Sequence, residues 1–255
     1  MSTEAIQGES PSPTRRPWGP GATIGWSVVI MIAFFLAQSI SAMLLLILRL
    51  GVEGLASMDA KSLESDGMVI SVATLGSFFL CVPLILFLAW LRKGPSVREY
   101  LGLRSPLRGA ALIWTVAFIA LIVGIEILNV ILNKPAVPDF MKAAYASVPH
   151  PVWLFLAVAI AAPVFEELFF RGFALEGLRH SRLGEIGAIL STSAAWAIIH
   201  LQYGIYEITI IFVMGIVLGL ARLRTNSLWT PIALHALNNT VAMIQVAMLA
   251  ADSAG

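Results

Sequence analysis

Hydrophobic residues follow one another along this chain in long segments, and short polar segments separate them. We predict helices over roughly 22–48, 69–91, 109–132, 153–178, 185–203, 205–222 and 227–250. A helix needs about 20 mostly apolar residues to cross a bilayer. The pattern therefore predicts an all-α, polytopic bundle of about seven transmembrane helices, or eight if segment 133–152 hides a re-entrant or extra piece.

Composition supports a membrane protein over a soluble one. The chain has 255 residues, of which 58% are hydrophobic and only 12% are charged, with a mean hydropathy of +0.87. A soluble domain carries about 25% charged residues to solvate its surface. The expected surroundings are thus a lipid bilayer. The net charge of +1 and the lack of a basic run give no sign of a nucleic-acid partner.

Charge asymmetry between the loops predicts an orientation. If the N-terminus lies inside, the inner segments hold most of the lysines and arginines, which are Arg15, Arg16, Arg92, Lys93, Arg98, Arg104, Arg108, Arg179, Arg182, Arg222 and Arg224. The outer segments hold only Arg49, Lys61, Lys134 and Lys142. This bias follows the positive-inside rule. We expect a cytoplasmic N-terminus in a bacterial plasma membrane.

The N-terminal half divides into two parts. Residues 1–21 are polar and rich in Pro, Gly, Ser and Thr, which predicts a flexible tail. The first apolar segment is about 25 residues long, too long for the core of a signal peptide. Residues 22–132 are therefore predicted to form three retained transmembrane helices.

Ionisable and amide side chains interrupt the later apolar segments. The fourth contains Glu166, Glu167 and Arg171, the fifth ends at His200, and the seventh contains His235, Asn238 and Asn239. Such groups are costly at membrane depth and usually face a cavity or each other. Glu167 and Arg171 are spaced i,i+4 and can pair on one helical face, whereas Glu166 is rotated by about 100° and points elsewhere.

Helical rise places these groups at similar depths. Counted from inner boundaries near Leu178, Glu185 and Asn226, Glu166 lies about 18 Å into the membrane, His200 about 22 Å, His235 about 14 Å and Asn239 about 20 Å. This estimate requires the fourth helix to continue to about Leu178. We therefore predict a polar intramembrane cavity.

The residue types in this cavity suit hydrolysis of an amide by an activated water. A desolvated carboxylate is a good general base, and His and Asn side chains can donate hydrogen bonds to an oxyanion. The sequence contains no GxSxG and no HExxH, and the single cysteine, Cys81, lies in an apolar segment. Covalent catalysis and the usual zinc-binding helix are therefore unsupported.

Three motifs resemble one known family. "EELFFR" (166–171) matches EExxxR, "WAIIH" (196–200) resembles FxxxH, and "HALNN" (235–239) resembles HxxxN of the CAAX-protease and bacteriocin-processing (Abi) family. The resemblance covers about residues 150–245, so 150–250 is taken as the catalytic helix bundle. Trp196 replaces Phe, which we interpret as a change at a packing position.

The resemblance implies an intramembrane endopeptidase related to type II CAAX prenyl endopeptidases. It assigns water activation to Glu166 and His200, oxyanion stabilisation to His235 and Asn239, and support to Glu167 and Arg171. The family is often classed as metalloproteases, although a metal-free, glutamate-dependent mechanism has also been proposed for it. Glu166, His200 and His235 could hold one divalent metal such as zinc, or only water. The expected substrate is a peptide or a membrane protein.

Two other functions use the same residues. One is a non-proteolytic scaffold or bacteriocin-immunity protein that binds a peptide in the cavity. The other is an ion-coupled transporter, which the absence of a long internal repeat disfavours. A purely structural ion-pair network is the corresponding alternative for Glu166, Glu167 and Arg171. Glu126, which has no partner nearby in sequence, is interpreted as an outer-end residue that reaches toward the membrane surface.

Overall fold

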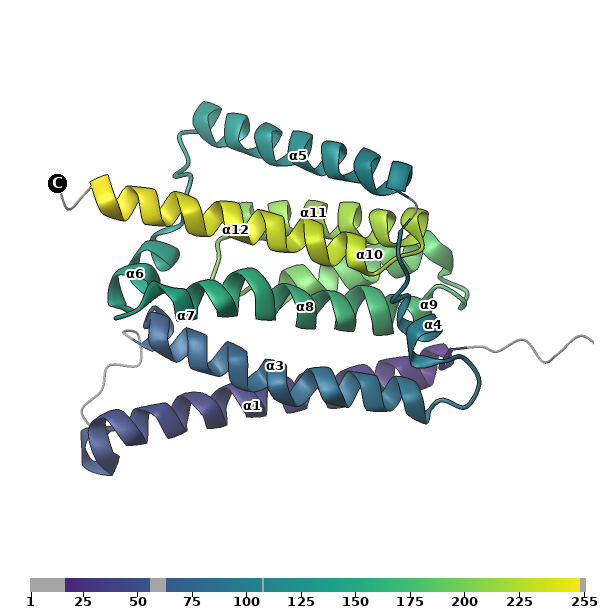
Figure 1. Ribbon diagram of the computed structural model, residues 1–255, viewed down its shortest axis with the longest axis horizontal. Coiled ribbons are helices and arrows are strands. Elements are labelled where there is room, and N and C mark those ends of the chain that lie inside the picture. The colour runs from purple at the N-terminus through teal and green to yellow at the C-terminus, as the bar shows by residue number, and fades with distance from the viewer. Residues whose placement is uncertain (1–16, 56–62, 107, 253–255) are drawn as a thin grey trace, which may run out of the picture.

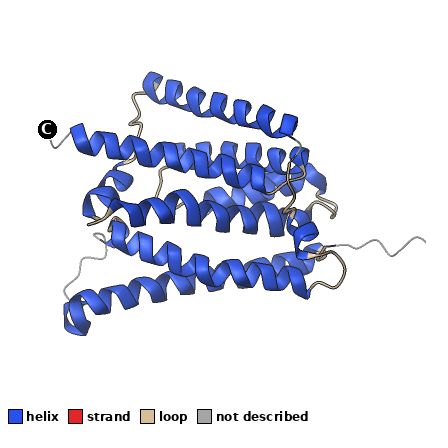
Figure 2. Cartoon of the chain, in the orientation of Figure 1, coloured by secondary structure: helices blue, strands red, loops and turns tan. Residues whose placement is uncertain are grey.

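A computed structural model describes residues 17–55, 63–106 and 108–252. Within these residues the chain forms helices joined by loops and contains no strand (Figure 2). The all-α prediction is confirmed. Most of the predicted flexible tail, residues 1–16, lies outside the described part of the chain.

The elements follow the predicted hydrophobic segments in order (Figure 1). They are α1 (Pro20–Leu55), α3 (Gly67–Leu91), α4 (Val97–Leu101), α5 (Arg108–Ile131), α6 (Asp139–Ser147), α7 (Pro151–Phe155), η1 (Leu156–Ala161), α8 (Ala162–Glu167), η2 (Leu168–Ala174), α9 (Leu175–Leu178), α10 (Gly184–Ile198), α11 (Ile205–Thr225) and α12 (Trp229–Asp252). The elements from α7 to α9 form one continuous helical segment, Pro151–Leu178. This segment continues to Leu178, as the depth estimate required.

Six helices in the described residues are long and apolar enough to cross a membrane. They correspond to six of the predicted spans. The remaining predicted span, 185–203, is α10, which has 15 residues and therefore a length of about 22 Å. The segment 133–152 contains the short helix α6, whose 9 residues are fewer than the ~20 that cross a bilayer, so the described residues add no eighth span there.

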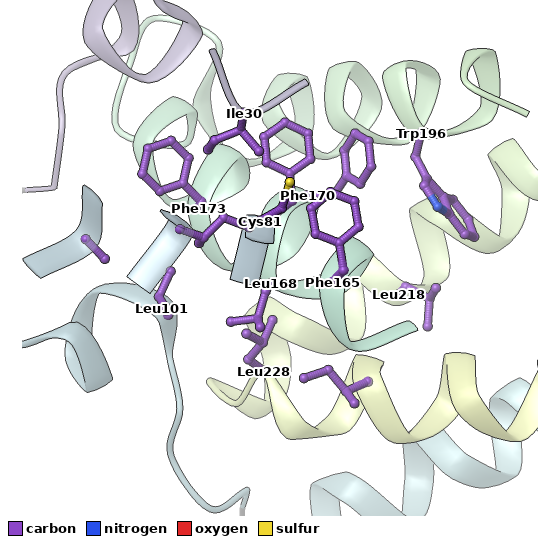
Figure 3. Packing of buried hydrophobic residues seen from close by; sticks show 14 of the residues in the cluster. Ile30, Cys81, Leu101, Phe165, Leu168, Phe170, Phe173, Trp196, Leu218 and Leu228 are labelled. Atoms are coloured by element: carbon purple, nitrogen blue, oxygen red, sulfur yellow. The ribbon is translucent and has the colours of Figure 1, made fainter. Parts of the chain in front are cut away.

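The segment Pro151–Leu178 occupies the middle of the bundle. It lies between the α1–α3 pair and the helices α10, α11 and α12 (Figure 1). Its phenylalanines Phe165, Phe169, Phe170 and Phe173 are buried, and they form a core together with residues of the surrounding helices (Figure 3). Phe34 of α1 stacks on Phe165 with ring centroids 4.7 Å apart. These contacts fix the charged side chains of this segment in the centre of the bundle.

Helix α5 packs on the outside and exposes large apolar side chains. Ile113 is 68% exposed and Val130 is 77% exposed. Apolar surface of this extent is unfavourable in water and is expected to face lipid. Together with the six spans, it identifies an integral membrane protein.

Two polar contacts attach α5 to its neighbours. Tyr206 on α11 donates a hydrogen bond to Asn129 (2.7 Å), and Gln245 on α12 donates one to Glu126 (3.2 Å). Glu126, which has no partner nearby in the sequence, therefore has one across the bundle. Its partner lies 119 residues away in the sequence, beyond the reach of local pattern.

A buried arginine holds the short helix α4 against the C-terminal end of α11. Arg222 is 2% exposed and lies 3.6 Å from Glu176. Its guanidinium packs against Gly102, where a Cβ atom would lie 2.0 Å from Nη2. Gly102 has a φ of +70°, a conformation that glycine adopts without strain. Arg222 thus has a packing role in addition to its contribution to loop charge.

Candidate active site

Glu167 and Arg171 form a buried ion pair. Arg171 Nη1 donates to Glu167 Oε1 at 2.9 Å, and both side chains are 0% exposed. The i,i+4 spacing predicted this pair, and the structure confirms it. Arg171 Nη2 also donates to the Gly215 carbonyl of α11 at 3.2 Å. The pair therefore connects the central helical segment to α11.

Glu167 also contacts His235, which the sequence did not predict. His235 Nδ1 lies 2.9 Å from Glu167 Oε1. A carboxylate only accepts hydrogen bonds, so we assign the Nδ1 proton to His235. This contact orients the ring so that Nε2 faces Glu166, with Nε2 4.0 Å from Glu166 Oε2. Glu167 thus fixes the tautomer and the direction of His235.

Glu166 points away from the Glu167–Arg171 pair, as its 100° rotation predicted. Its side chain is 12% exposed, against 0% for Glu167. Trp196 Nε1 donates a hydrogen bond to Glu166 Oε2 at 2.5 Å. The interpretation of Trp196 as a packing substitution is therefore wrong, because its indole N–H contacts the carboxylate directly. A phenylalanine offers no such donor.

His200 lies just beyond the end of α10. Its Nδ1 is 2.8 Å from the Trp196 carbonyl, which only accepts, so Nδ1 carries the proton and Nε2 is the free ring nitrogen. Its ring is edge-on to Trp196, with centroids 5.4 Å apart. No hydrogen bond joins His200 to Glu166 in the described structure. Trp196 lies in contact with both.

Asn239 fills a gap in the backbone hydrogen bonding of the central segment. The Ala162 N–H bonds to the Ala157 carbonyl, in the register of a π-helix. In this register the Val158 carbonyl would accept from Pro163, which has no N–H. Asn239 Nδ2 donates to Val158 instead, at 2.8 Å. Asn239 keeps a second amide hydrogen, while the amide of Asn238 donates to Asn239 Oδ1 (3.2 Å).

A small cavity adjoins Glu166. Its volume is about 50 Å³, enough for a water molecule, which needs about 10–15 Å³. It is lined by side chains of α1, α3 and the central segment, namely Phe34, Gln38, Thr74, Ser77, Ala161, Ala162, Phe165 and Glu166. The first two helices thus contribute polar groups beside Glu166. Gln38, an amide within an apolar span, was the available sequence signal.

The residues proposed as metal ligands do not converge on one point. No three His, Cys, Asp or Glu side chains within the described ranges are grouped closely enough to hold a metal ion. Glu166 and His235 approach each other, but His200 turns Nδ1 to its own helix. Two protein ligands fall short of the three that catalytic zinc sites use. These three side chains therefore do not fit a metal site, and the proposed reaction uses no metal ion.

Comparison with known proteins identifies the family to which the chain belongs. The model of the family "Type II CAAX prenyl endopeptidase Rce1-like" matches residues 148–241, which include all six predicted site residues. A protein of Escherichia coli, "Uncharacterized 24.3 kDa protein", is 30% identical over 180 residues, covering 68% of this chain and 78% of the relative. No solved structure matches. The chain belongs to the Rce1-like family of CAAX-type intramembrane endopeptidases.

Proposed function

We propose that this protein cleaves a peptide bond within the membrane, with Glu166 activating the attacking water and His235 stabilising the oxyanion. The observation that carries the proposal is that His235 Nε2 lies 4.0 Å from Glu166 Oε2; Glu166 also lines a cavity with room for water. This separation is too long for a direct hydrogen bond and suits groups that share a bound water or a substrate atom.

Each of the two groups has a role that fits its partners. Glu166 is the general base: it removes a proton from water as the oxygen attacks the scissile carbonyl, and it later gives the proton to the leaving amine. His235 stabilises the oxyanion through Nε2–H. This role uses the doubly protonated ring, whose other N–H, at Nδ1, is accepted by the buried Glu167 carboxylate, as in other carboxylate–histidine pairs.

His200 and Asn239 make secondary contacts to the substrate in this proposal. His200 Nε2 is free of hydrogen bonds to described residues and, because the proton is on Nδ1, it accepts a hydrogen bond from the substrate or from water. Asn239 uses one amide hydrogen for the Val158 carbonyl and can donate the other to the oxyanion. Neither has a hydrogen bond to Glu166 in the described structure, so we assign the role of general base to Glu166 alone and not to a Glu166–His200 pair.

The substrate class follows from the family description and from the location of the site. We propose a peptide or membrane-protein substrate whose cleaved segment enters from the bilayer. A prenylated CAAX tail is the substrate that the family name gives, and a bacterial leader peptide is the alternative. The expected location is a bacterial plasma membrane with a cytoplasmic N-terminus.

The test is Glu166→Gln in purified protein reconstituted in liposomes. Two probes are used: an internally quenched farnesylated CAAX peptide, and any peptide that accumulates uncleaved in membranes of cells carrying only Glu166→Gln. We expect cleavage to fall by at least about a hundredfold, the lower range for loss of a general base. Cleavage at the wild-type rate would refute the assignment.

Glu126→Gln is the matched control. It makes the same change in another glutamate of an apolar span, which accepts a hydrogen bond from Gln245 on α12 and does not line the cavity. We expect wild-type cleavage by this variant. If both glutamine variants lost activity equally, the loss would reflect the removal of a buried carboxylate in general and not of a catalytic base.

A further inference from the structure

Trp196 contacts every titratable group of the proposed site except Glu167. It is 2% exposed and lies to one side of the buried phenylalanine cluster (Figure 3). Its ring is edge-on to His200 and to His235, with the His235 centroid 5.1 Å away. The Arg171 guanidinium carbon lies 4.4 Å from the ring centroid, within the range of a cation–π interaction.

The hydrogen bond to Glu166 is a directional restraint. Glu166 is the less buried of the adjacent carboxylates, and Trp196 Nε1 is a donor from a different helix. A glutamate side chain has three rotatable bonds, and fixing them costs free energy when no partner holds them. The indole position is itself fixed by Arg171 on one face and by close packing against Gly215, where a Cβ would lie 3.1 Å from Trp196 Cε3.

We infer that Trp196 is a positioning residue, whose indole N–H holds the Glu166 carboxylate in the orientation that faces His235. The inference rests on the proposed function, in which Glu166 is the base. It adds that a residue of α10, and not only the helix that carries Glu166, holds the base in place. The residue that was interpreted as a neutral replacement of phenylalanine thereby becomes part of the machinery that orients the attacking water.

Several charged or titratable side chains surround the Glu166 carboxylate. They come from its own helix, from α12 and from the end of α10, and they are Glu167, Arg171, His235, His200 and Tyr203. From α1 and α3 the cavity receives the neutral polar groups Gln38, Thr74 and Ser77. The indole N–H is an uncharged donor, so its loss removes a hydrogen bond without changing the charge around the base.

Trp196→Phe removes the N–H and keeps an aromatic ring at the position. We expect kcat on the quenched peptide to fall about tenfold, the usual effect of losing a hydrogen bond to a charged group, with KM within about twofold because the ring remains. Trp18→Phe is the control, since it removes an indole hydrogen bond to the Leu88 carbonyl (3.0 Å) far from the site.

A spectroscopic measurement separates this inference from the proposed function. In protein labelled with ¹⁵N at the tryptophan indoles, the Trp196 signal is the one that disappears in Trp196→Phe. We expect this signal to differ between the wild type and Glu166→Gln, because the indole N–H then faces a neutral amide instead of a carboxylate. If the signal is unchanged in Glu166→Gln, or if Trp196→Phe and Trp18→Phe have the same kinetics, the positioning role is refuted even where Glu166→Gln is inactive. An active Glu166→Gln whose Trp196 signal responds refutes the base assignment alone.

Discussion

The buried Glu167–Arg171 pair allows a quantitative test of how this fold holds its charges. Replacing Arg171 by Met keeps most of the apolar stem and removes the guanidinium. Glu167 Oε1 then keeps only His235 Nδ1 as a donor, and Glu167 Oε2 already has no partner among the described residues. The Gly215 carbonyl loses its donor as well.

The expected cost is large because the remaining charge is fully buried. Removing one partner of a buried ion pair typically destabilises a protein by about 3–5 kcal/mol. The same 2.9 Å N–O distance occurs between Lys142 and Asp139, whose side chains are 42% and 92% exposed. Exposed pairs contribute at most about 1 kcal/mol. Lys142→Met is therefore the control, because it breaks an ion pair with the same N–O distance that is exposed instead of buried.

Cys81 supplies the assay. It is the single cysteine of the chain and is 0% exposed, so a maleimide reaches it only when the bundle opens. When reclosing is faster than alkylation, the alkylation rate follows the equilibrium population of the open form. In detergent micelles, a loss of about 3 kcal/mol predicts alkylation at least about a hundredfold faster in Arg171→Met, and little change in Lys142→Met.

The double variant Glu167→Gln/Arg171→Met removes both charges and should recover about 1–3 kcal/mol relative to Arg171→Met. Alkylation rates that differ less than fivefold between Arg171→Met and Lys142→Met would refute the reasoning. So would a double variant less stable than Arg171→Met, because the cost would then come from lost packing and not from a charge without a partner.

Two further predictions follow from the same packing and ligand geometry. Gly215→Ala places a Cβ 2.9 Å from Ser193 Cβ, so we expect the free energy of unfolding to fall by about 1–3 kcal/mol through overpacking. The control is Gly124→Ala, whose added Cβ meets nothing within 4 Å and which should be neutral or stabilising. Equal rates of Cys81 alkylation in the two variants would contradict this prediction. Because the described His, Cys, Asp and Glu side chains form no group of three, cleavage of the quenched peptide should persist after dialysis against a zinc chelator; activity lost on dialysis and restored by added zinc would contradict the geometry.

The sequence predicted the features that depend on composition and on short spacing. Hydropathy located the six helices of spanning length, because about 20 apolar residues are needed to cross a bilayer. The spacing of Glu167 and Arg171 predicted their ion pair, because neighbours at i,i+4 share one face of a helix. Both predictions use interactions within a single helix, where the geometry is known in advance.

Features that depend on two helices could not be derived in this way. The contact of His235 with Glu167 spans 68 residues, and that of Trp196 with Glu166 spans 30 residues. The contact of Asn239 with Val158 depends on a π-helical register and on the missing N–H of Pro163, neither of which changes the hydropathy pattern. The length of α10 was overestimated because residues 199–203 are apolar or aromatic enough to extend the span, while the helix ends at Ile198.

The two adjacent glutamates have different environments, and this difference explains why the chain carries both. Glu167 is 0% exposed and has charged or ring N–H donors from Arg171 and His235, so its charge is held in place and its oxygens have no room for a substrate. Glu166 is partly open, borders the cavity, and has a neutral indole as its donor. A general base must reach the attacking water, and Glu166 is the carboxylate that borders the cavity. Since His235 is oriented by Glu167 and faces Glu166, the two glutamates place a fixed acceptor and the proposed base on opposite sides of one imidazole ring.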